Sequence, residues 1–150
     1  MITGMTNGVF DILHVGHVRF LEACSQFCDE LVVCINSDSS TRALKGSGRP
    51  VFGEKDRCAI LSALSCVDRV EVFHEQTVAE AMRHIRPCIW FKGSPYTLDT
   101  INPMEMDVCK MQGIHVHLIP RVSPLSTTGI IERVIKHAID SGLVAAPNPA

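Results

Sequence analysis

Short apolar segments alternate with helix-like segments about five times along this chain, and this alternation restricts the folds that it can adopt. The clearest apolar run is LVVCI at 31–35, which polar residues beginning with Asn36 terminate, as expected for a strand buried on both faces. Strands separated by helices are typical of a parallel sheet that helices cover on both sides. The sequence therefore predicts an α/β protein with a Rossmann-like, doubly wound parallel sheet of five strands.

The individual strands and helices are assigned from hydrophobic periodicity and from turn residues. We expect strands within 4–10, 29–38, 68–73, 88–93 and 114–120. We expect helices within 15–28, 39–44, 54–67, 77–86, 104–113 and 126–142. Thr77, with Glu80 three residues later, is the expected cap of the fourth helix. Ligands of such sheets bind beyond the carboxyl ends of the strands, so chemistry is expected in the loops that follow the strands.

The composition suits one globular domain without a strong bulk charge. The 150 residues are 46% hydrophobic, and 14 basic against 16 acidic residues give a net charge of −2. Residues 1–142 are expected to form the domain, and 143–150 a tail or a linker to a further domain in a longer chain. We expect no nucleic acid and no membrane as partner, and a cytoplasmic location, because no signal peptide or membrane-length apolar run occurs.

The seven cysteines form no C-x-x-C pair, and their number is odd. Cys34 and Cys88 lie inside apolar, strand-like runs. A disulfide framework or a cysteine zinc site is therefore disfavoured, and we expect the thiols to act as small buried hydrophobic groups.

The loop after the first expected strand carries Asp11, His14, Gly16 and His17. A helix that begins near Val15 leaves its first backbone N–H groups unpaired, and its dipole adds partial positive charge, so an anion is favoured there. The glycine would let an anion approach the backbone, and the two imidazoles can donate hydrogen bonds to one phosphoryl group. Two other interpretations stay open: a metal site with Asp11, although a third ligand is lacking, and purely structural histidines.

A hydroxyl-rich segment precedes the last expected helix. Ser126, Thr127 and Thr128 are expected to cap that helix and to form a second phosphate-binding helix start, although such a run is most often an ordinary N-cap. Separate cations could neutralise a triphosphate or could be surface charges. They are Lys45, Arg49, Arg57, Lys92 and Arg121. Neither a Walker A nor a G-x-G-x-x-G motif occurs, which argues against a P-loop kinase and a dinucleotide-dependent dehydrogenase.

HVGH at 14–17, together with STTGII at 126–131, resembles the H-x-G-H nucleotidyltransferase superfamily and its cytidylyltransferase-like branch, over about residues 4–141. Segments from NGVFDILHVGHVRFLEA through LKGSGRPV at 44–51 to FKG at 91–93 resemble the domain that transfers a nucleotide to heptose 1-phosphate. IPRVSPLSTT at 119–128 instead resembles the R-T-x-G-I-S-T signature of glycerol-3-phosphate cytidylyltransferase.

The resemblance implies an enzyme in which a phosphate oxygen of an acceptor attacks the α-phosphorus of a nucleoside triphosphate and pyrophosphate leaves. It also implies Mg²⁺ as cofactor, no tight metal site made by the protein, and a homodimer. Carried over by position, the catalytic residues would be His14, His17, Lys45 and Arg57. The nucleotide would be bound by Asn7, Gly8, Phe10, Asp11, Gly16, Lys92, Gly93, Arg121, Ser126, Thr127 and Thr128. The acceptor would be bound by Asn36, Asp38, Arg49 and Tyr96.

Two departures from these patterns affect the expected substrates. KGSPY at 92–96 replaces the K-G-G-D-Y of the heptose enzymes, and 122–125 differ from most of the middle of the cytidylyltransferase signature. Arg121 with the Ser-Thr-Thr run favours CTP, so we expect a cytidylyltransferase that acts on a small phosphorylated or phosphonylated alcohol or sugar. The alternatives are an ATP-using heptose 1-phosphate adenylyltransferase, a phosphonate cytidylyltransferase domain of a fused protein, and a nucleotide-binding module without turnover.

Overall fold

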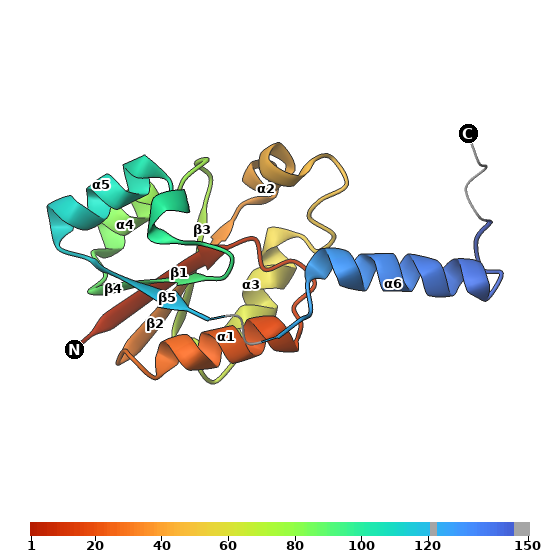
Figure 1. Cartoon of the computed structure of the whole chain (residues 1–150), viewed down its shortest axis with the longest axis horizontal. Coiled ribbons are helices and arrows are strands. Elements are labelled where there is room, and N and C mark those ends of the chain that lie inside the picture. Colours follow the sequence, from red (N-terminus) through yellow and green to blue (C-terminus); the bar gives the residue numbers. More distant parts are fainter. Residues whose placement is uncertain (121–122, 146–150) are drawn as a thin grey trace.

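The computed structural model describes residues 1–120 and 123–145, which form a five-stranded parallel sheet with helices on both sides (Figure 1). The strands are β1 (Thr3–Gly8), β2 (Glu30–Asn36), β3 (Arg69–Phe73), β4 (Ile89–Gly93) and β5 (His115–Ile119). The helices are α1 (Val15–Ser25), α2 (Asp38–Lys45), α3 (Glu54–Ser62), α4 (Ala79–Ile85), α5 (Pro103–Gln112) and α6 (Thr127–Asp140), and a short 3₁₀ helix spans Leu98–Thr100. The predicted α/β class and five-stranded parallel sheet are confirmed. Arg121 and 146–150 of the expected tail lie outside the described residues.

The strand order is β3-β2-β1-β4-β5, so the chain winds outward from β1 in both directions. Thr6 at the middle of this arrangement pairs with Val33 of β2 on one side and with Phe91 of β4 on the other. Loops that follow the two central strands diverge at such a switch point and leave a crevice beyond the strand ends. The β1–α1 loop and the residues after β4 therefore border the expected ligand site.

Side chains of the strands alternate between two cores, one on each face of the sheet. Met5, Cys34 and Trp90 pack against α4 and α5 on one side, which we call the α4/α5 face. Val33 and Phe91 pack against α1 and α3 on the other side, the α1/α3 face. This alternation decides on which side of the sheet each polar residue at the strand ends lies.

Several helix boundaries differ from the sequence-based expectation, and α1 ends at Ser25, before the expected residue 28. The helix expected over 54–67 ends at Ser62, and tight turns such as Leu64 N–H to Leu61 O lead into β3. The predicted threonine cap of the fourth helix is wrong, because this helix begins at Ala79 with Val78 as N-cap and no side chain capping it. The backbone N–H of Val78 donates instead to the carboxylate of Glu105 on α5, a contact that the local sequence does not reveal.

The last helix, α6, extends away from the sheet, and none of its residues is buried (Figure 1). Its apolar stripe includes Val134 and Ile135, whose side chains remain 63% and 52% exposed. The start of the helix is anchored to the site, since the Thr127 hydroxyl donates to the backbone carbonyl of Asp11 at 2.9 Å. Neither α6 nor any other helix in residues 1–120 and 123–145 combines the length and the hydropathy of a membrane span.

All seven cysteines are free thiols, as the absence of paired spacings suggested. Cys24, Cys34 and Cys109 are buried, whereas Cys88 is exposed at the start of β4. Burial raises the pKa of the Cys34 thiol to about 12, so this group stays protonated and serves as a small core side chain.

Candidate nucleotide-binding site

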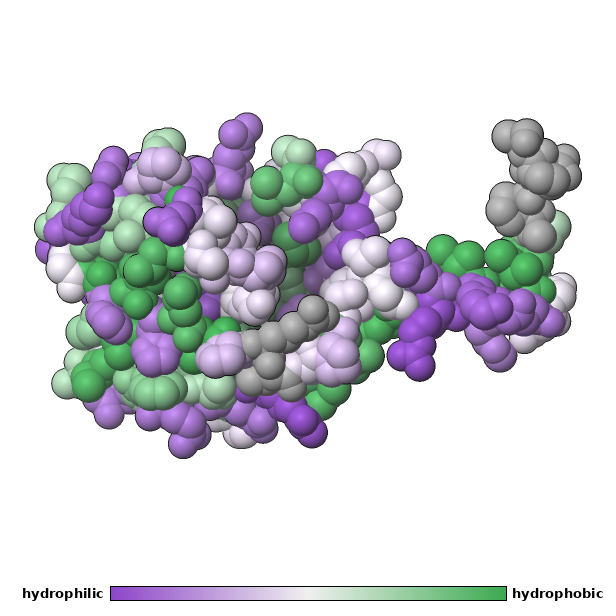
Figure 2. Space-filling view, viewed as in Figure 1, coloured by the Kyte–Doolittle hydropathy of each residue, from purple (hydrophilic) through white to green (hydrophobic). Residues whose placement is uncertain are grey.

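A cavity of about 940 Å³ opens beyond the carboxyl ends of β1 and β4, at the switch point of the sheet. Figure 2 shows the surface hollowed beside the start of α6. The predicted site residues that line it are Asn7, Gly8, Phe10, Asp11, His14, Gly16, His17, Asn36, Lys45, Arg49, Lys92, Gly93, Tyr96, Ser126, Thr127 and Thr128. Two predicted residues, Asp38 and Arg57, do not line it, and Arg121 lies outside the described residues. The sequence motifs therefore converge on one cavity although their residues come from distant parts of the chain.

The two histidines of the HVGH segment form a reciprocal cap at the start of α1. His14 is the N-cap residue, and its Nδ1 accepts a hydrogen bond from the backbone N–H of Gly16 at 3.1 Å. His17 Nδ1 in turn lies 3.4 Å from the backbone nitrogen of His14 and accepts from it. The centroids of the two imidazole rings lie 3.9 Å apart, and the ring planes are tilted by 31°. The expectation of fully unpaired N–H groups at this helix start is corrected, because His14 already satisfies one of them.

This cap determines what the imidazoles can do chemically. Burial lowers the pKa of His14, and burial together with the charge of His14 lowers the pKa of His17 to about 4. Both rings are therefore neutral near pH 7, and rings whose Nδ1 atoms accept carry their proton on Nε2. Each Nε2–H remains a donor that can stabilise negative charge on a phosphoryl oxygen without transferring a proton.

Gly16 is required by the histidine cap. A Cβ atom at this position would lie 2.8 Å from Cε1 and 2.9 Å from Nδ1 of His14, closer than real Cβ contacts. The glycine thus makes room for the capping imidazole, whereas the sequence suggested that it makes room for an anion. Any larger side chain there would push His14 out of its position and break the reciprocal cap.

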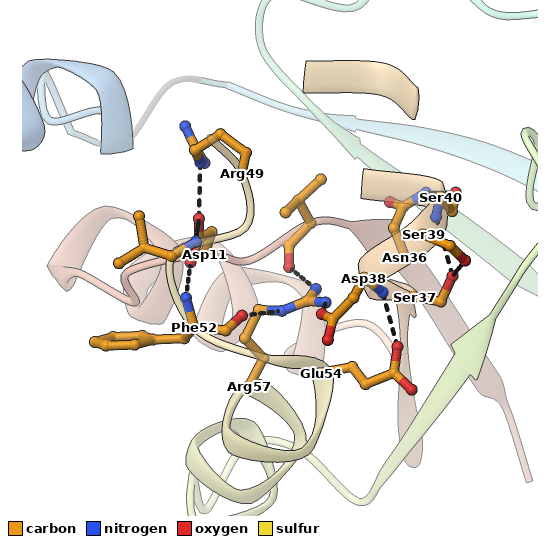
Figure 3. A network of polar contacts seen from close by, with 12 residues as sticks. Asp11, Asn36, Ser37, Asp38, Ser39, Ser40, Arg49, Phe52, Glu54 and Arg57 are labelled. Carbon is orange, nitrogen blue, oxygen red and sulfur yellow. Dashed lines mark hydrogen bonds and ion pairs between the residues drawn. The ribbon is translucent and has the colours of Figure 1, made fainter. Parts of the chain in front are cut away.

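Asp11 connects the β1–α1 loop to the glycine-rich segment after α2 (Figure 3). Its carboxylate is 1% exposed and accepts from Arg49 Nε at 2.7 Å and from the backbone N–H groups of Val51 and Phe52 at 2.7 and 2.9 Å. Burial alone would raise the pKa of Asp11, but these hydrogen bonds and the Arg49 charge hold it below its usual value. Asp11 therefore anchors the segment that carries Arg49, and its oxygens are already occupied, which argues against a metal-binding role.

The backbone beside Asp11 adopts an unusual conformation. Phe10 and Ile12 have φ angles of 51° and 48°, in the left-handed region that side-chain-bearing residues avoid, above all β-branched ones. Such conformations cost about 1–3 kcal/mol each and persist where surrounding contacts enforce them. The contacts of the Asp11 carboxylate lie between these two residues, so they hold the strained loop in the shape that presents the histidines.

Arg57, predicted to hold phosphate, does not line the cavity, because its guanidinium is bound elsewhere. The residue is 1% exposed, and its guanidinium donates to the carbonyls of Val9 and Phe52 at 2.6 and 2.9 Å and to the Asp38 carboxylate at 2.9 Å (Figure 3). Asp38 is likewise occupied by this ion pair and does not reach the acceptor side of the cavity. Both residues hold the loops around the site in place, and neither contacts it.

The start of α6 forms the second wall of the site. Ser126 is the N-cap residue, and its hydroxyl accepts from the backbone N–H of Gly129 at 3.1 Å, as the sequence predicted. Thr127 joins α6 to Asp11, so two helix starts, those of α1 and α6, border the same cavity. Backbone N–H groups and hydroxyls at two helix starts suit a chain of phosphates.

A second part of the cavity is lined by residues for which the sequence suggested no role in ligand binding. They are Gln76, Thr77, Val78, Asn102 and Glu105, from the ends of β3 and the starts of α4 and α5. Glu105 is only 7% exposed and accepts from Val78 N–H at 3.2 Å. Their sequence signal is weak, because most of them are ordinary polar residues near helix starts, and only the folded chain brings these helix starts to the cavity.

The doubly wound sheet, with imidazole donors at one helix start and hydroxyls at another, is an α/β fold of the nucleotidyltransferase type. The comparisons with known proteins agree. The chain belongs to the cytidylyltransferase-like family, whose model matches residues 5–133.

Several relatives share the name "Bifunctional protein HldE". The chain is 45% identical over 131 residues to the one from Geobacter sulfurreducens and 47% identical over 130 residues to the one from Syntrophotalea carbinolica. These matches cover 87% of this chain but only 26% of either relative, so the chain spans about a quarter of their length.

Solved structures also resemble this fold. A lipopolysaccharide core biosynthesis protein from Thermoplasma volcanium is 33% identical, with a TM-score of 0.67, and the match covers 82% of this chain and 98% of that one. Pantothenate synthetase from Thermus thermophilus matches with a TM-score of 0.56, 14% identity and coverage of 95% and 71%, which supports the fold alone.

Proposed function

We propose that this chain transfers AMP from ATP to a heptose 1-phosphate, forming an ADP-heptose and releasing pyrophosphate. The observation that carries the proposal is the 45–47% identity with HldE proteins over 87% of the chain. That similarity favours the heptose 1-phosphate branch, which uses ATP, over the glycerol phosphate branch. The similarity to a lipopolysaccharide core biosynthesis protein supports a sugar phosphate acceptor.

The proposal replaces the preference for CTP that the sequence suggested. That preference depended on Arg121 together with the Ser-Thr-Thr run, and Arg121 lies outside the described residues. The remaining hydroxyls, Ser126 to Thr128, line the cavity and would bind the phosphates of any nucleotide equally well, since a hydroxyl at that place does not distinguish one base from another. The base is therefore assigned from the relatives.

In this reaction a phosphate oxygen of the acceptor forms a bond to the α-phosphorus of ATP. The bond between that phosphorus and the bridging oxygen to the β-phosphate breaks, and pyrophosphate leaves with the electron pair. His14 and His17 would donate Nε2–H hydrogen bonds to the α-phosphate as its charge builds up, and Ser126 and Thr127 would hold the leaving phosphates. No general base is needed, because the attacking phosphate is already ionised at neutral pH.

Magnesium would enter this site as part of the nucleotide substrate. In the described part of the chain no three His, Cys, Asp or Glu side chains are grouped so that they could hold a metal ion. Asp11 is the carboxylate nearest to the histidines along the chain, and Arg49, Val51 and Phe52 already occupy its oxygens. Magnesium commonly retains several waters and binds mainly through substrate phosphates, which fits such a site.

The test is pyrophosphate release from the chain with each of the four nucleoside triphosphates, magnesium, and a panel of acceptors. We expect release with ATP and heptose 1-phosphate, and little with glycerol 3-phosphate or phosphonates. A preference for CTP would overturn the nucleotide assignment. Thermal stabilisation by ATP without pyrophosphate release for any acceptor would instead identify a binding module without turnover.

A further inference from the structure

The cavity extends to both faces of the sheet edge, and only its α1/α3 side has a role in the mechanism described above. The histidines, Asp11 and the start of α6 lie together there, since Thr127 bonds to Asp11 and a Cβ on Gly16 would lie 3.2 Å from Ser123. On the opposite side, the cavity wall includes Lys92 from the end of β4 and Glu105 from α5.

Lys92 lies on the α4/α5 face of the sheet. Its strand neighbour two residues earlier, Trp90, belongs to the core on that face, and alternate residues of a strand share a face. The ammonium group lies 4.7 Å from the Trp90 ring centroid and 4.1 Å from that of Tyr96. Lys92 is thereby held at the end of β4 between two aromatic rings.

The ammonium of Lys92 is buried and has few hydrogen-bond partners. The residue is 5% exposed, and its described hydrogen bond is a long one, 3.4 Å, to Oδ1 of Asn7, an oxygen that also accepts from Trp90 Nε1. No ion pair within 4.0 Å joins Lys92 to a carboxylate in the described part of the chain. Burial lowers the pKa of Lys92, and the negative charge of Glu105 opposes this shift without reversing it. An ammonium has three N–H donors, so this one can take a further anionic oxygen from the cavity.

The geometry of nucleotidyl transfer indicates which anionic oxygen the Lys92 ammonium binds. In phosphoryl and nucleotidyl transfer the attacking and leaving oxygens lie roughly in line on opposite sides of the phosphorus. The proposed pyrophosphate position is at the start of α6, on the α1/α3 side, and the α-phosphate would lie at the end of β1 beside the histidines. The acceptor must therefore approach from the α4/α5 side, where Lys92 is the buried cation.

We propose that Lys92 binds the phosphate of the acceptor and orients its attacking oxygen, and that Glu105 faces the acceptor's hydroxyl groups. This inference rests on the proposed function and assigns Lys92 to the acceptor, whereas the sequence had placed it with the nucleotide. A carboxylate next to the phosphate site also selects the acceptor, because it accepts hydrogen bonds from sugar hydroxyls and repels a second anionic group.

The test compares Lys92→Met with wild type in steady-state kinetics, varying ATP and heptose 1-phosphate separately. Methionine fills the space between Trp90 and Tyr96 without a charge, so the fold is expected to survive; ATP-dependent thermal stabilisation checks this. The KM for the acceptor should rise about 10- to 100-fold, the effect of losing one charge-assisted hydrogen bond, while the KM for ATP stays within about two-fold. Ser126→Ala, at the proposed pyrophosphate position, should show the opposite pattern.

An unchanged KM for the acceptor, or a raised KM for ATP, overturns the assignment of Lys92. Calorimetry of heptose 1-phosphate binding in the presence of a non-hydrolysable ATP analogue tests the same assignment without turnover. Equal affinity of wild type and Lys92→Met for heptose 1-phosphate, or no binding to wild type, also overturns the assignment of Lys92. Failure of the proposed function is a separate result, because wild type would then turn over a different sugar phosphate. The KM for that sugar phosphate can be compared between wild type and Lys92→Met in the same way.

Discussion

The carboxylate of Asp11 and the guanidinium of Arg49 are joined at 2.7 Å across 38 residues of sequence, and this ion pair attaches the glycine-rich segment after α2 to the histidine loop. Asp11 is completely enclosed, whereas the Arg49 side chain is 18% exposed to the cavity. The charge of Arg49 is thus positioned at the cavity by a carboxylate that is itself fully buried. The shape of the histidine loop and the position of a cavity cation depend on one carboxylate.

Replacing that carboxylate with an amide should disturb both loops. In Asp11→Asn the side-chain NH₂ group would face the N–H of Val51 or Phe52, and Arg49 would lose its counter-charge. We expect the variant to be less stable by about 2 kcal/mol or more and its KM for ATP to rise about ten-fold, on the scale of charged hydrogen bonds. Urea denaturation and steady-state kinetics measure the two effects.

Asp99→Asn is the matched control, because Asp99 is exposed in the short 3₁₀ helix and does not line the cavity. It should leave both quantities unchanged. An Asp11→Asn protein as stable as wild type would show that the carboxylate does not anchor the loop.

The strands and the fold class could be predicted because hydrophobic periodicity is local. LVVCI is apolar on both faces and lies in β2, buried against both cores. Hydrophobic periodicity and local capping patterns did not predict the start of α4. The helix was expected to be capped by Thr77, but Glu105, 28 residues further along the chain, accepts from its N-cap residue instead. Local patterns identify elements, but contacts between distant elements decide how the ends of those elements are capped.

The site could be predicted in outline for a related reason. Motifs after parallel strands must meet at one edge, so His14, Lys92 and Ser126 could be placed in the same cavity. Which cation faces the ligand could not be predicted, since Arg57 and Lys45 look alike in sequence. Burial and distant carbonyls make Arg57 structural, while Lys45 is exposed at the end of α2 and borders the cavity.

The capping role of His14 and the catalytic role that we propose for it can be separated by one pair of variants. Asparagine is a strong N-cap residue, so His14→Asn should keep the stability of α1 while removing the Nε2–H donor. His14→Ala removes both the side-chain cap of α1 and the Nε2–H donor. We expect kcat to fall about 100-fold or more in both variants, the scale of losing one transition-state donor, and stability to fall by about 1 kcal/mol only in the alanine variant.

Rapid-quench or pyrophosphate-release kinetics give kcat, and thermal denaturation gives the stability of both proteins. His137→Ala is the control, because this histidine lies in the last turn of α6, away from the main cavity. Near-normal kcat in His14→Asn would mean that His14 acts only as a cap.

Arg57 should behave as a structural residue. Arg57→Gln leaves the Asp38 carboxylate without its partner and the carbonyls of Val9 and Phe52 without their donors. Breaking a fully buried ion pair costs about 3–5 kcal/mol; here the Asp38 side chain is 32% exposed, so a smaller but clear loss of about 2 kcal/mol and a drop in Tm are expected. At a temperature where the variant remains folded, its KM for ATP should lie within about two-fold of wild type.

Arg42→Gln is the matched control, since Arg42 is exposed on the neighbouring helix α2 and should tolerate the change without a drop in Tm. A stable Arg57→Gln protein with a strongly raised KM for ATP would restore the phosphate-binding role that the sequence suggested.

His17 should make the stability of the nucleotide-free protein depend on pH. Its pKa is about 4 in the folded protein, mainly through burial, against 6.5 for an ordinary histidine. Between these values the unfolded chain binds a proton that the folded chain does not, so the free energy of unfolding rises with pH through this window and levels off above 6.5.

Wild type should therefore lose about 3 kcal/mol, relative to His17→Asn, as pH falls from 7 to 4. Asparagine retains an oxygen that can accept from His14 N–H, so the comparison removes the titrating group and keeps the contact. Urea denaturation at a series of pH values measures the difference, and two parallel stability curves would show that His17 does not titrate with a lowered pKa.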